Sequence, residues 1–306
     1  MTYSRAVLRK LAVHGGLFVA CCVTTTLVGY LGASPHSLAA GLAFGGTLMA
    51  ILTCHELGHY VVARRRGVDV SLPYFIPLPP PTLGTLGAVI RMREQISDRG
   101  ALFDVGASGP IAGLVVAIPL LVVGLSISPL APITPGGSQE GNSLLYAALK
   151  YAVFHRWLPG GGVDVVLHPM ALAAWVGILV TMINLMPIGQ LDGGHVARAA
   201  LGDRHERMSA RLHVALPAIG GLTGAVMLAI ALHAGRGLIG ALDYAKDGVV
   251  PWLVWWLLLA FMRRQAGEYH PPVDDIPLDP LRRRLALGML VVFALIATPV
   301  PFRQVL

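Results

Sequence analysis

The sequence is short of charged residues. Only 13% of its 306 residues are charged, 55% are hydrophobic, and the mean hydropathy is +0.68. A soluble globular protein usually carries about 25% charged residues, so the composition argues against a soluble domain and favours a membrane protein. The net charge of +7 does not indicate nucleic acid as a partner, because the basic residues stand at the ends of apolar runs instead of forming one patch.

The sequence also has little cysteine. Cys21, Cys22 and Cys54 all lie in apolar runs, and no CxxC pair occurs. This pattern does not indicate a disulfide framework or a cysteine-based zinc site. Cys54 precedes a histidine, but adjacent helical residues point about 100° apart, which makes it a poor partner in binding one ion. Internal repeats and low-complexity tails are absent as well.

Long apolar runs dominate the chain. They occur at about 11–31, 38–63, 104–128, 170–197, 212–234 and 285–300, with a shorter run at 249–262 that could begin near 237. All of the longer runs except 285–300 reach or exceed the roughly 20 residues that a spanning helix needs. We therefore predict an all-α polytopic membrane protein with about seven transmembrane helices (six to eight). The first run resembles a signal peptide, but its length favours an uncleaved span.

The positions of lysine and arginine predict the orientation. With seven spans and the N-terminus inside, 18 of the 23 basic residues fall in inside segments and 5 in outside segments. This is a strong positive-inside bias. We expect a multi-pass protein of the cell (inner) membrane with a cytoplasmic N-terminus.

Two connecting segments have distinct patterns. The inside segment 67–100 contains prolines that exclude a regular helix across 73–81, and its stretch "TLGAVIRM" alternates as a β-strand does. The outside segment 129–169 is rich in Gly and Pro, with room for a short helix at 143–157. Neither segment is long enough for a sizeable soluble domain.

A cluster of polar residues interrupts the second apolar run. His55, Glu56 and His59 form the pattern HExxH. Residues i and i+4 share one helix face, so both imidazoles can reach one zinc ion, with Glu56 placed to act as a base on water. Two buried structural histidines would explain the pair but leave Glu56 in a membrane helix at a cost of a few kcal/mol.

A catalytic zinc usually has three protein ligands. Asp192 is a candidate for the third, because it ends a long apolar run and precedes Arg198, toward the inside face. His59 precedes Arg64 in the same way, so topology places both residues at similar depth. Pro187 breaks or bends the helix before Asp192, and a broken helix at membrane depth is tolerated where it lines a wet cavity.

These motifs resemble the site-2 protease family of intramembrane zinc metalloproteases, peptidase family M50. The family pairs HExxH with NxxPxxxxDG, which Asn184, Pro187, Asp192 and Gly193 match. The stretch "GTLGAVI" at 84–90 is similar to the family's membrane-associated β element. The resemblance covers about 55–195 and implies a three-helix catalytic core. No segment is similar to the inserted PDZ or CBS domains of some relatives.

The resemblance implies a role for each motif residue. His55, His59 and Asp192 would bind one catalytic Zn²⁺ per chain, and Glu56 would be the base. Asn184 would hold the substrate backbone or the oxyanion, although an asparagine bonded between helices would look the same. The implied substrate-binding strand comprises Gly84, Thr85, Leu86, Gly87 and Ala88.

The remaining histidines need separate interpretations. His195 follows Asp192 by three residues, so it is either a partner of the metal ligands or an alternative ligand, and we favour the partner role. His205 lies in a charged inside segment, where we expect it to be solvated. The others, including His213 and His270, lack ligand spacing.

We expect one membrane-embedded peptidase domain over 1–306. It would comprise an N-terminal span and loop at 1–37, the catalytic core at 38–200 and accessory spans at 201–306. The predicted function is intramembrane cleavage of transmembrane segments of other proteins, so the partners would be a transmembrane protein substrate and the lipid bilayer. The alternatives are a metal-binding transporter, for which inverted repeats are missing, and a catalytically inactive membrane chaperone of the same fold.

Overall fold

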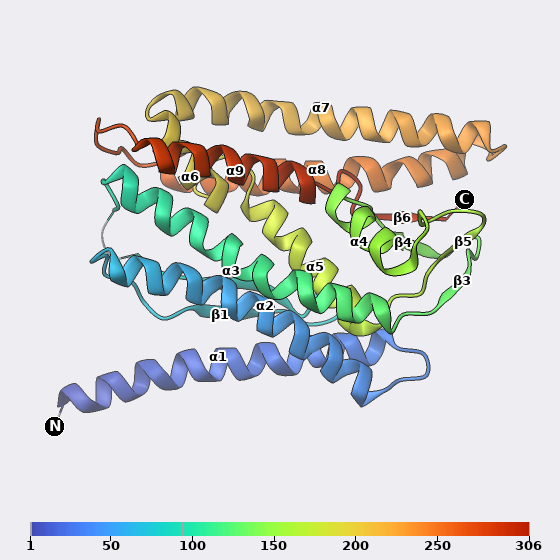
Figure 1. Ribbon diagram of the computed structural model, residues 1–306, viewed down its shortest axis with the longest axis horizontal. Coiled ribbons are helices and arrows are strands. Elements are labelled where there is room, and N and C mark those ends of the chain that lie inside the picture. The colour runs from blue at the N-terminus through green and yellow to red at the C-terminus, as the bar shows by residue number, and fades with distance from the viewer. Residues whose placement is uncertain (1, 93–94, 306) are drawn as a thin grey trace. The chain divides into compact units, whose positions relative to one another are not determined.

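The computed structural model is mostly helical and describes residues 2–92 and 95–305 (Figure 1). The chain divides into two compact units. Unit 1 comprises Met1–Ile96, Asp104–Pro129 and Val165–Thr181, and unit 2 comprises Ser97–Phe103, Leu130–Asp164 and Met182–Leu306. Two helices, α3 and α5, continue from one unit into the other.

Unit 1 holds the first helices and a small hairpin. Its elements are α1 (Thr2–Gly32), α2 (Leu38–Arg65), β1 (Tyr74–Pro77), β2 (Thr85–Val89), most of α3 (Arg99–Ser126) and most of α5 (Pro169–Asn184). The pairing of β1 with β2 is antiparallel. The predicted β element at 84–90 is therefore present as a strand.

Unit 2 contains the remaining elements, except for Val165 at the end of β5. They are β3 (Leu130–Pro132), β4 (Ser138–Glu140), α4 (Leu144–Phe154), β5 (Val163–Val165), α6 (Asp192–Leu201), α7 (Arg204–His233), α8 (Leu238–Ala266), α9 (Pro280–Ile296) and β6 (Phe302–Gln304). Strand β3 pairs with β5, and β4 pairs with β6. Helix α4 confirms the short helix expected in the outside segment.

Five of the described helices are long and apolar enough to cross a membrane. They are Leu8–Gly32, Leu38–Arg65, Arg99–Ser126, Arg204–His233 and Leu238–Gln265. Helix α5 has 16 residues and α9 has 17, so both fall short of the roughly 20 residues of a full span. The seven-span prediction is thus supported for five helices, and the count of seven stays a prediction.

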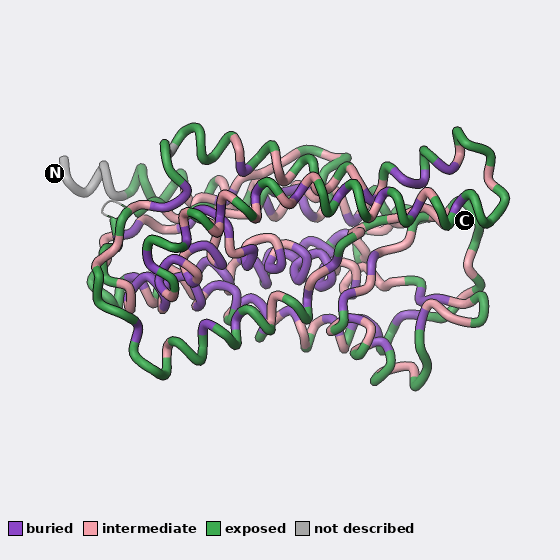
Figure 2. Tube along the Cα trace, turned by 90° about the horizontal axis from the view of Figure 1, so that it is seen from above, coloured by how far each residue is buried: buried purple, intermediate pink, exposed green. Residues whose placement is uncertain are grey.

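Large apolar side chains remain exposed along the long helices. Val115 of α3, Leu222 of α7 and Leu257 of α8 are each more than half exposed. Figure 2 shows exposed residues recurring along most helices, with buried residues between them. Such surfaces suit contact with lipid, since a water-facing protein rarely shows extended apolar patches.

Local sequence explains where the helices begin and end. The Ser37 side chain accepts a hydrogen bond from the Ala40 amide and caps α2, and Asp279 caps α9 just before Pro280. The long run at 170–197 is not one helix, because α5 ends at Asn184 and α6 begins at Asp192. The predicted break at Pro187 is confirmed.

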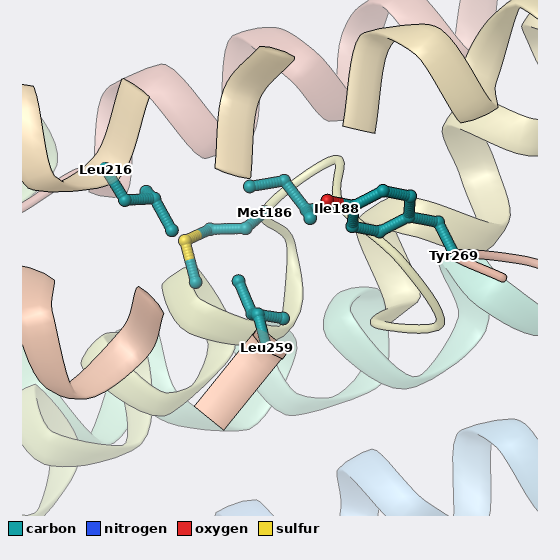
Figure 3. Close-up of a cluster of buried hydrophobic side chains, with 5 residues drawn as sticks. All are labelled: Met186, Ile188, Leu216, Leu259 and Tyr269. Atoms are coloured by element: carbon teal, nitrogen blue, oxygen red, sulfur yellow. The ribbon is translucent and has the colours of Figure 1, made fainter. Parts of the chain in front are cut away.

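The non-helical segment 185–191 is held by an apolar cluster in unit 2. Met186 and Ile188 from this segment pack with Leu216 of α7, Leu259 of α8 and Tyr269 beyond α8, and all five side chains are buried (Figure 3). The cluster therefore fixes an irregular segment that lacks helical hydrogen bonds of its own.

Helices α1 and α2 lie side by side and pack through a GxxxG pattern (Figure 1). A Cβ on Gly41 would lie 2.6 Å from the Thr26 carbonyl oxygen, and one on Gly45 would lie 2.7 Å from the Thr26 amide. Only glycine lets the two backbones approach this closely. The β-hairpin joins the same assembly, because the Thr24 hydroxyl donates to the Gly84 carbonyl at 2.6 Å.

Replacing Gly45 with alanine should weaken this packing. We expect Gly45→Ala to lower the free energy of unfolding by about 1–3 kcal/mol, measured by thermal unfolding in a neutral detergent. Gly46→Ala is the matched control, because a Cβ there meets nothing within 4 Å; it should be neutral or slightly stabilising. Equal effects of the two substitutions would contradict the proposed close contact.

Candidate metal centre

Two histidines meet on one face of α2. The Nε2 atoms of His55 and His59 lie 3.2 Å apart, and the ring centroids are 4.9 Å apart at an angle of 70°. The helical repeat accounts for the approach, because residues i and i+4 stand one above the other. His55 is buried and His59 is partly buried. Two imidazole nitrogens therefore face each other in a mostly dry environment.

A hydrogen bond to the next helix determines the tautomer of His59. Its Nδ1 lies 2.8 Å from the carbonyl oxygen of Val105 on α3. A carbonyl oxygen only accepts, so Nδ1 carries the proton and donates, and the lone pair of the neutral ring is on Nε2. The nitrogen that faces His55 is thus the one able to bind a metal.

The donor set fits zinc. Two ligands at about 2.0–2.1 Å from a tetrahedral ion lie about 3.3 Å apart, close to the 3.2 Å between the two Nε2 atoms. A metal-bound histidine usually donates its other ring N–H to a carbonyl or carboxylate, as His59 does to Val105. Imidazole nitrogens are also ligands that zinc prefers.

Helix α3 leaves space for the two rings by presenting glycine. A Cβ on Gly109 would overlap the His59 ring at Nε2, and a Cβ on Gly113 would lie 3.2 Å from His55 Nδ1. The two glycines are four residues apart and share a face of α3. At the C-terminal end of α2, Arg66 forms an ion pair with Asp104 of α3, which ties the two helices together.

Glu56 stands beside His55 on α2 and is 8% exposed. A carboxylate so little exposed on a membrane helix is expensive to bury unless it is used or compensated. Its position agrees with the predicted role of a base, which stays a prediction. Leu57, the next residue, is 42% exposed, so the buried side of this turn is the one with His55 and Glu56.

Asn184 and Asp192 belong to unit 2 and mark the two ends of the break. Asn184 is the last residue of α5, and Asp192 is the first residue of α6. A Cβ on Gly193 would overlap the Leu185 carbonyl, so the segment folds back closely over the first turn of α6. Asp192 lies at the positive end of the helix dipole, which favours an ionised carboxylate.

His195, on the same turn of α6 as Asp192, contacts a histidine from beyond α8. His195 Nδ1 lies 2.8 Å from His270 Nε2, and His270 Nδ1 lies 2.8 Å from the Pro271 carbonyl. The carbonyl only accepts, so His270 donates to it from Nδ1 and accepts at Nε2 from His195. His270 thereby orients His195, whose role toward the metal ligands stays a prediction.

His205 corrects a sequence-based expectation. We expected a solvated residue, but His205 is fully buried, and its Nε2 lies 3.0 Å from the Ser209 hydroxyl. The physical reason is that α7 begins at Arg204, so His205 lies on the inner face of a helix instead of in a loop. Within unit 2, no three described histidines, cysteines or carboxylates bring ligand atoms within 4.8 Å of one another.

The predicted substrate-binding strand lies in the hairpin of unit 1. Thr85 is buried and its hydroxyl donates to the Ile76 carbonyl at 3.0 Å, whereas Leu86 is 69% exposed. Gly84 and Gly87 have positive φ angles of 82° and 94°, which favour glycine. Since β1 and β2 form a two-stranded sheet, β2 has one edge that β1 does not cover.

Sequence reasoning missed the contribution of α3. Val105, Gly109 and Gly113 touch the histidine pair, but none of them carries a chemical group that marks a site. A signal existed in "GASGPIAG", a run of small residues inside an apolar segment, which is typical of close helix packing. His270 offered no comparable signal, because its partner lies 75 positions away.

Comparison with known proteins adds a family match. Residues 43–227, more than half of the chain, match the model of peptidase family M50. The match includes the histidine pair, the hairpin, α3 and the break before α6.

Two similar proteins are plant proteins. The chain is 34% identical over 171 residues to the probable zinc metalloprotease EGY1, chloroplastic, of Arabidopsis thaliana, covering 53% of this chain and 29% of the relative. It is 30% identical over 267 residues to the probable zinc metalloprotease EGY2, chloroplastic, of the same plant, covering 82% of this chain and 40% of the relative. The chain thus spans well under half the length of these relatives.

A methyl group at Gly109 should exclude the metal. We expect Gly109→Ala to lower zinc affinity more than about ten-fold, because the new Cβ displaces the His59 ring; the bound zinc per purified chain measures this. Ile111→Ala is the control on the same helix, since Ile111 is half exposed, and it should keep the metal. A Gly109→Ala protein that retains full zinc would contradict this geometry.

His270 predicts a dependence of stability on pH. Burial lowers its pKa below 6.5, Arg198 acts in the same direction, and the hydrogen bond to Pro271 and the Glu206 carboxylate oppose them. The unfolded chain then binds more protons, so the His270 contribution to stability is lost as pH falls below about 6.5. Between about pH 7 and pH 5, thermal unfolding should show a smaller loss for His270→Gln than for the wild type.

The exposed His36 provides the control for this pH experiment. His36→Gln should lose as much stability in acid as the wild type. An equal loss for wild type and His270→Gln would show that His270 does not resist protonation in the folded protein.

Proposed function

Because the chain belongs to peptidase family M50, we propose that it is a zinc metalloprotease that cleaves transmembrane segments of other membrane proteins. The observation that carries the proposal is the His55–His59 pair, with Nε2 atoms 3.2 Å apart and the His59 tautomer fixed by Val105. The relatives named above are described as probable zinc metalloproteases, and the five helices long and apolar enough to cross a membrane support action within a bilayer.

Three residues would hold the zinc ion. His55 and His59 supply two nitrogens, and Asp192 supplies a carboxylate oxygen as the third ligand. Two histidines and one carboxylate are a common catalytic set that leaves a position open. The dipole of α6 supports Asp192 in the ionised form that ligation needs. When bound there, a zinc ion would polarise a peptide carbonyl and lower the pKa of water enough for attack near neutral pH.

The proton transfers fall to Glu56. Its carboxylate accepts a proton from the attacking water and later gives it to the nitrogen of the leaving amine. The Asn184 side-chain amide donates to the oxygen that becomes negative at the reacting carbonyl, or to the substrate backbone. Such a donor contributes most where water is scarce and its position is fixed in advance.

A helical substrate must unwind before it can be cleaved. All amides of a transmembrane helix are bonded internally, so its peptide carbonyls are shielded. We propose that the edge of β2 that β1 does not cover, within the predicted substrate-binding stretch Gly84–Ala88, pairs with the unwound stretch by β-addition. The exposure of Leu86 and Val89 beside this edge offers apolar side chains for the substrate to contact.

The charge distribution supports a specific arrangement in the membrane. We propose a single peptidase domain, with a core at 38–200 between the span at 1–37 and accessory helices at 201–306. The 18 basic residues in inside segments support seven spans and a cytoplasmic N-terminus. The shorter α5 and α9 would complete the seven.

The decisive experiment separates metal binding from chemistry. Glu56→Gln should keep its zinc but cleave a fluorogenic membrane-spanning helix at least about 100-fold more slowly, because only the base is lost. Asp192→Ala should lose both zinc and cleavage, because a ligand is removed. Zinc content and cleavage are measured on the same purified preparations, with and without a chelator.

The controls distinguish the alternatives. Lys246→Gln, an exposed substitution on α8, should leave zinc content and cleavage unchanged. Full activity of Glu56→Gln would refute the mechanism. One bound zinc in Asp192→Ala would remove Asp192 from the ligand set. A wild-type protein that binds zinc and cleaves nothing would instead support a transporter or an inactive chaperone.

A further inference from the structure

Unit 2 contains a groove that the proposed chemistry does not use. Its cavity volume is about 520 Å³, and it lies between α6 and α9, with the start of α7 at one end. Helices α6 and α9 are in contact (Figure 1). The volume falls within the roughly 300–1,000 Å³ that is usual for sites of small molecules.

Two helix faces form the apolar walls of this groove. The lining residues include Gly193, Val196, Ala197 and Ala200 on α6 and Ala286, Leu287 and Leu290 on α9. The spacing on each helix is that of one continuous face. Leu287 and Leu290 are more than half exposed, so the groove opens outward instead of being sealed in the core.

One end of the groove is basic. Arg204 opens α7, and Arg283 lies in the first turns of α9; both line the groove. Residues 99–100 connect these two regions, because Arg99 donates to the Ala199 carbonyl and Gly100 lies close to Arg282. The C-terminal end of α6 and the N-terminal end of α9 therefore lie at the same end of the groove.

The two arginines also lack an acidic partner. Both side chains are exposed, and across residues 2–92 and 95–305 no carboxylate forms an ion pair with either. By contrast, Arg198 pairs with Asp203 and Arg282 with Asp279. The groove thus joins an apolar slot to two uncompensated positive charges.

We propose that this groove binds an anionic phospholipid, with one acyl chain between α6 and α9 and the headgroup phosphate at Arg204 and Arg283. Basic pockets beside apolar helices suit such lipids, and the cytoplasmic leaflet that supplies them is negatively charged. In the predicted topology, the helix ends that carry Arg204 and Arg283 lie at the inside face of the membrane. Guanidinium groups bind phosphate oxygens in pairs of parallel hydrogen bonds.

Other occupants suit the groove less well. A transmembrane helix of about 20 residues is far larger than a groove of about 520 Å³, and its apolar side chains would not use the arginines. Free phosphate would use the arginines but leave the apolar walls empty. A phospholipid uses both parts of the groove, because its charged headgroup is joined to an apolar chain just as the basic end of the groove adjoins the apolar walls.

Native mass spectrometry of the full chain in neutral detergent micelles tests the proposal without any assay of cleavage. Phosphatidylglycerol should bind at one site. The double variant Arg204→Gln/Arg283→Gln should bind it roughly thirty-fold more weakly, given the usual contribution of each basic residue. The double variant Arg207→Gln/Arg284→Gln removes equal charge from exposed residues of the same helices outside the groove and should bind as the wild type does.

Three further arms separate the parts of the ligand. Phosphatidylcholine with the same acyl chains should bind much more weakly, and inorganic phosphate at the lipid concentration should not displace phosphatidylglycerol. Ala200→Leu fills the apolar slot and should reduce lipid binding with both arginines intact. Equal weakening in the two arginine variants, equal binding of the two lipids, or displacement by phosphate or by a transmembrane peptide would overturn the proposal.

Discussion

The hydrogen bond from His59 to the Val105 carbonyl is the constraint on which the metal centre depends. It fixes the proton on Nδ1 and leaves the lone pair on Nε2, 3.2 Å from the Nε2 of His55. Without it, the ring could adopt the other tautomer or turn away, and the spacing of the two histidines along α2 would not suffice. The bond also joins α2 to α3, so the packing of these two helices also determines the tautomer of His59.

Close approach of helix backbones is the condition that this bond requires. Gly109 and Gly113 make room for the imidazoles, and Gly41 and Gly45 let α1 approach the other part of α2. In a bilayer, the hydrophobic effect does not favour one apolar helix face over another as a packing surface, because lipid is equally apolar. Small residues and polar contacts therefore determine which helix faces meet. The apolar side chains that cannot find a protein neighbour remain on the outside, where lipid accommodates them.

In unit 2, the irregular backbone is stabilised by side-chain packing and by hydrogen bonds to its polar groups. The break at 185–191 is held by the Met186 and Ile188 side chains, and the Gly189 amide donates to the Ser209 hydroxyl. Nearby, His213 donates from Nε2 to the Trp256 carbonyl and accepts from the Tyr269 hydroxyl. A broken helix persists at membrane depth only when such partners replace the lost helical bonds.

The sequence by itself determined the features that depend on local spacing. The pairing of His55 with His59, the break at Pro187, the strand at Thr85–Val89 and five of the long helices all follow from periodicity, proline chemistry and hydropathy over a few neighbouring residues. Hydropathy also placed the start of α7 near 212 instead of Arg204, because charged residues in its first turns resemble a loop. That difference explains why His205 was expected in solvent.

Only the tertiary structure decided which nitrogen of His59 can bind a metal, which glycines of α3 shelter the rings, and that His270 orients His195. Each of these depends on a contact between residues 46 to 75 positions apart. Local propensity carries no information about which carbonyl a ring will meet, because that is set by how helices pack after they form.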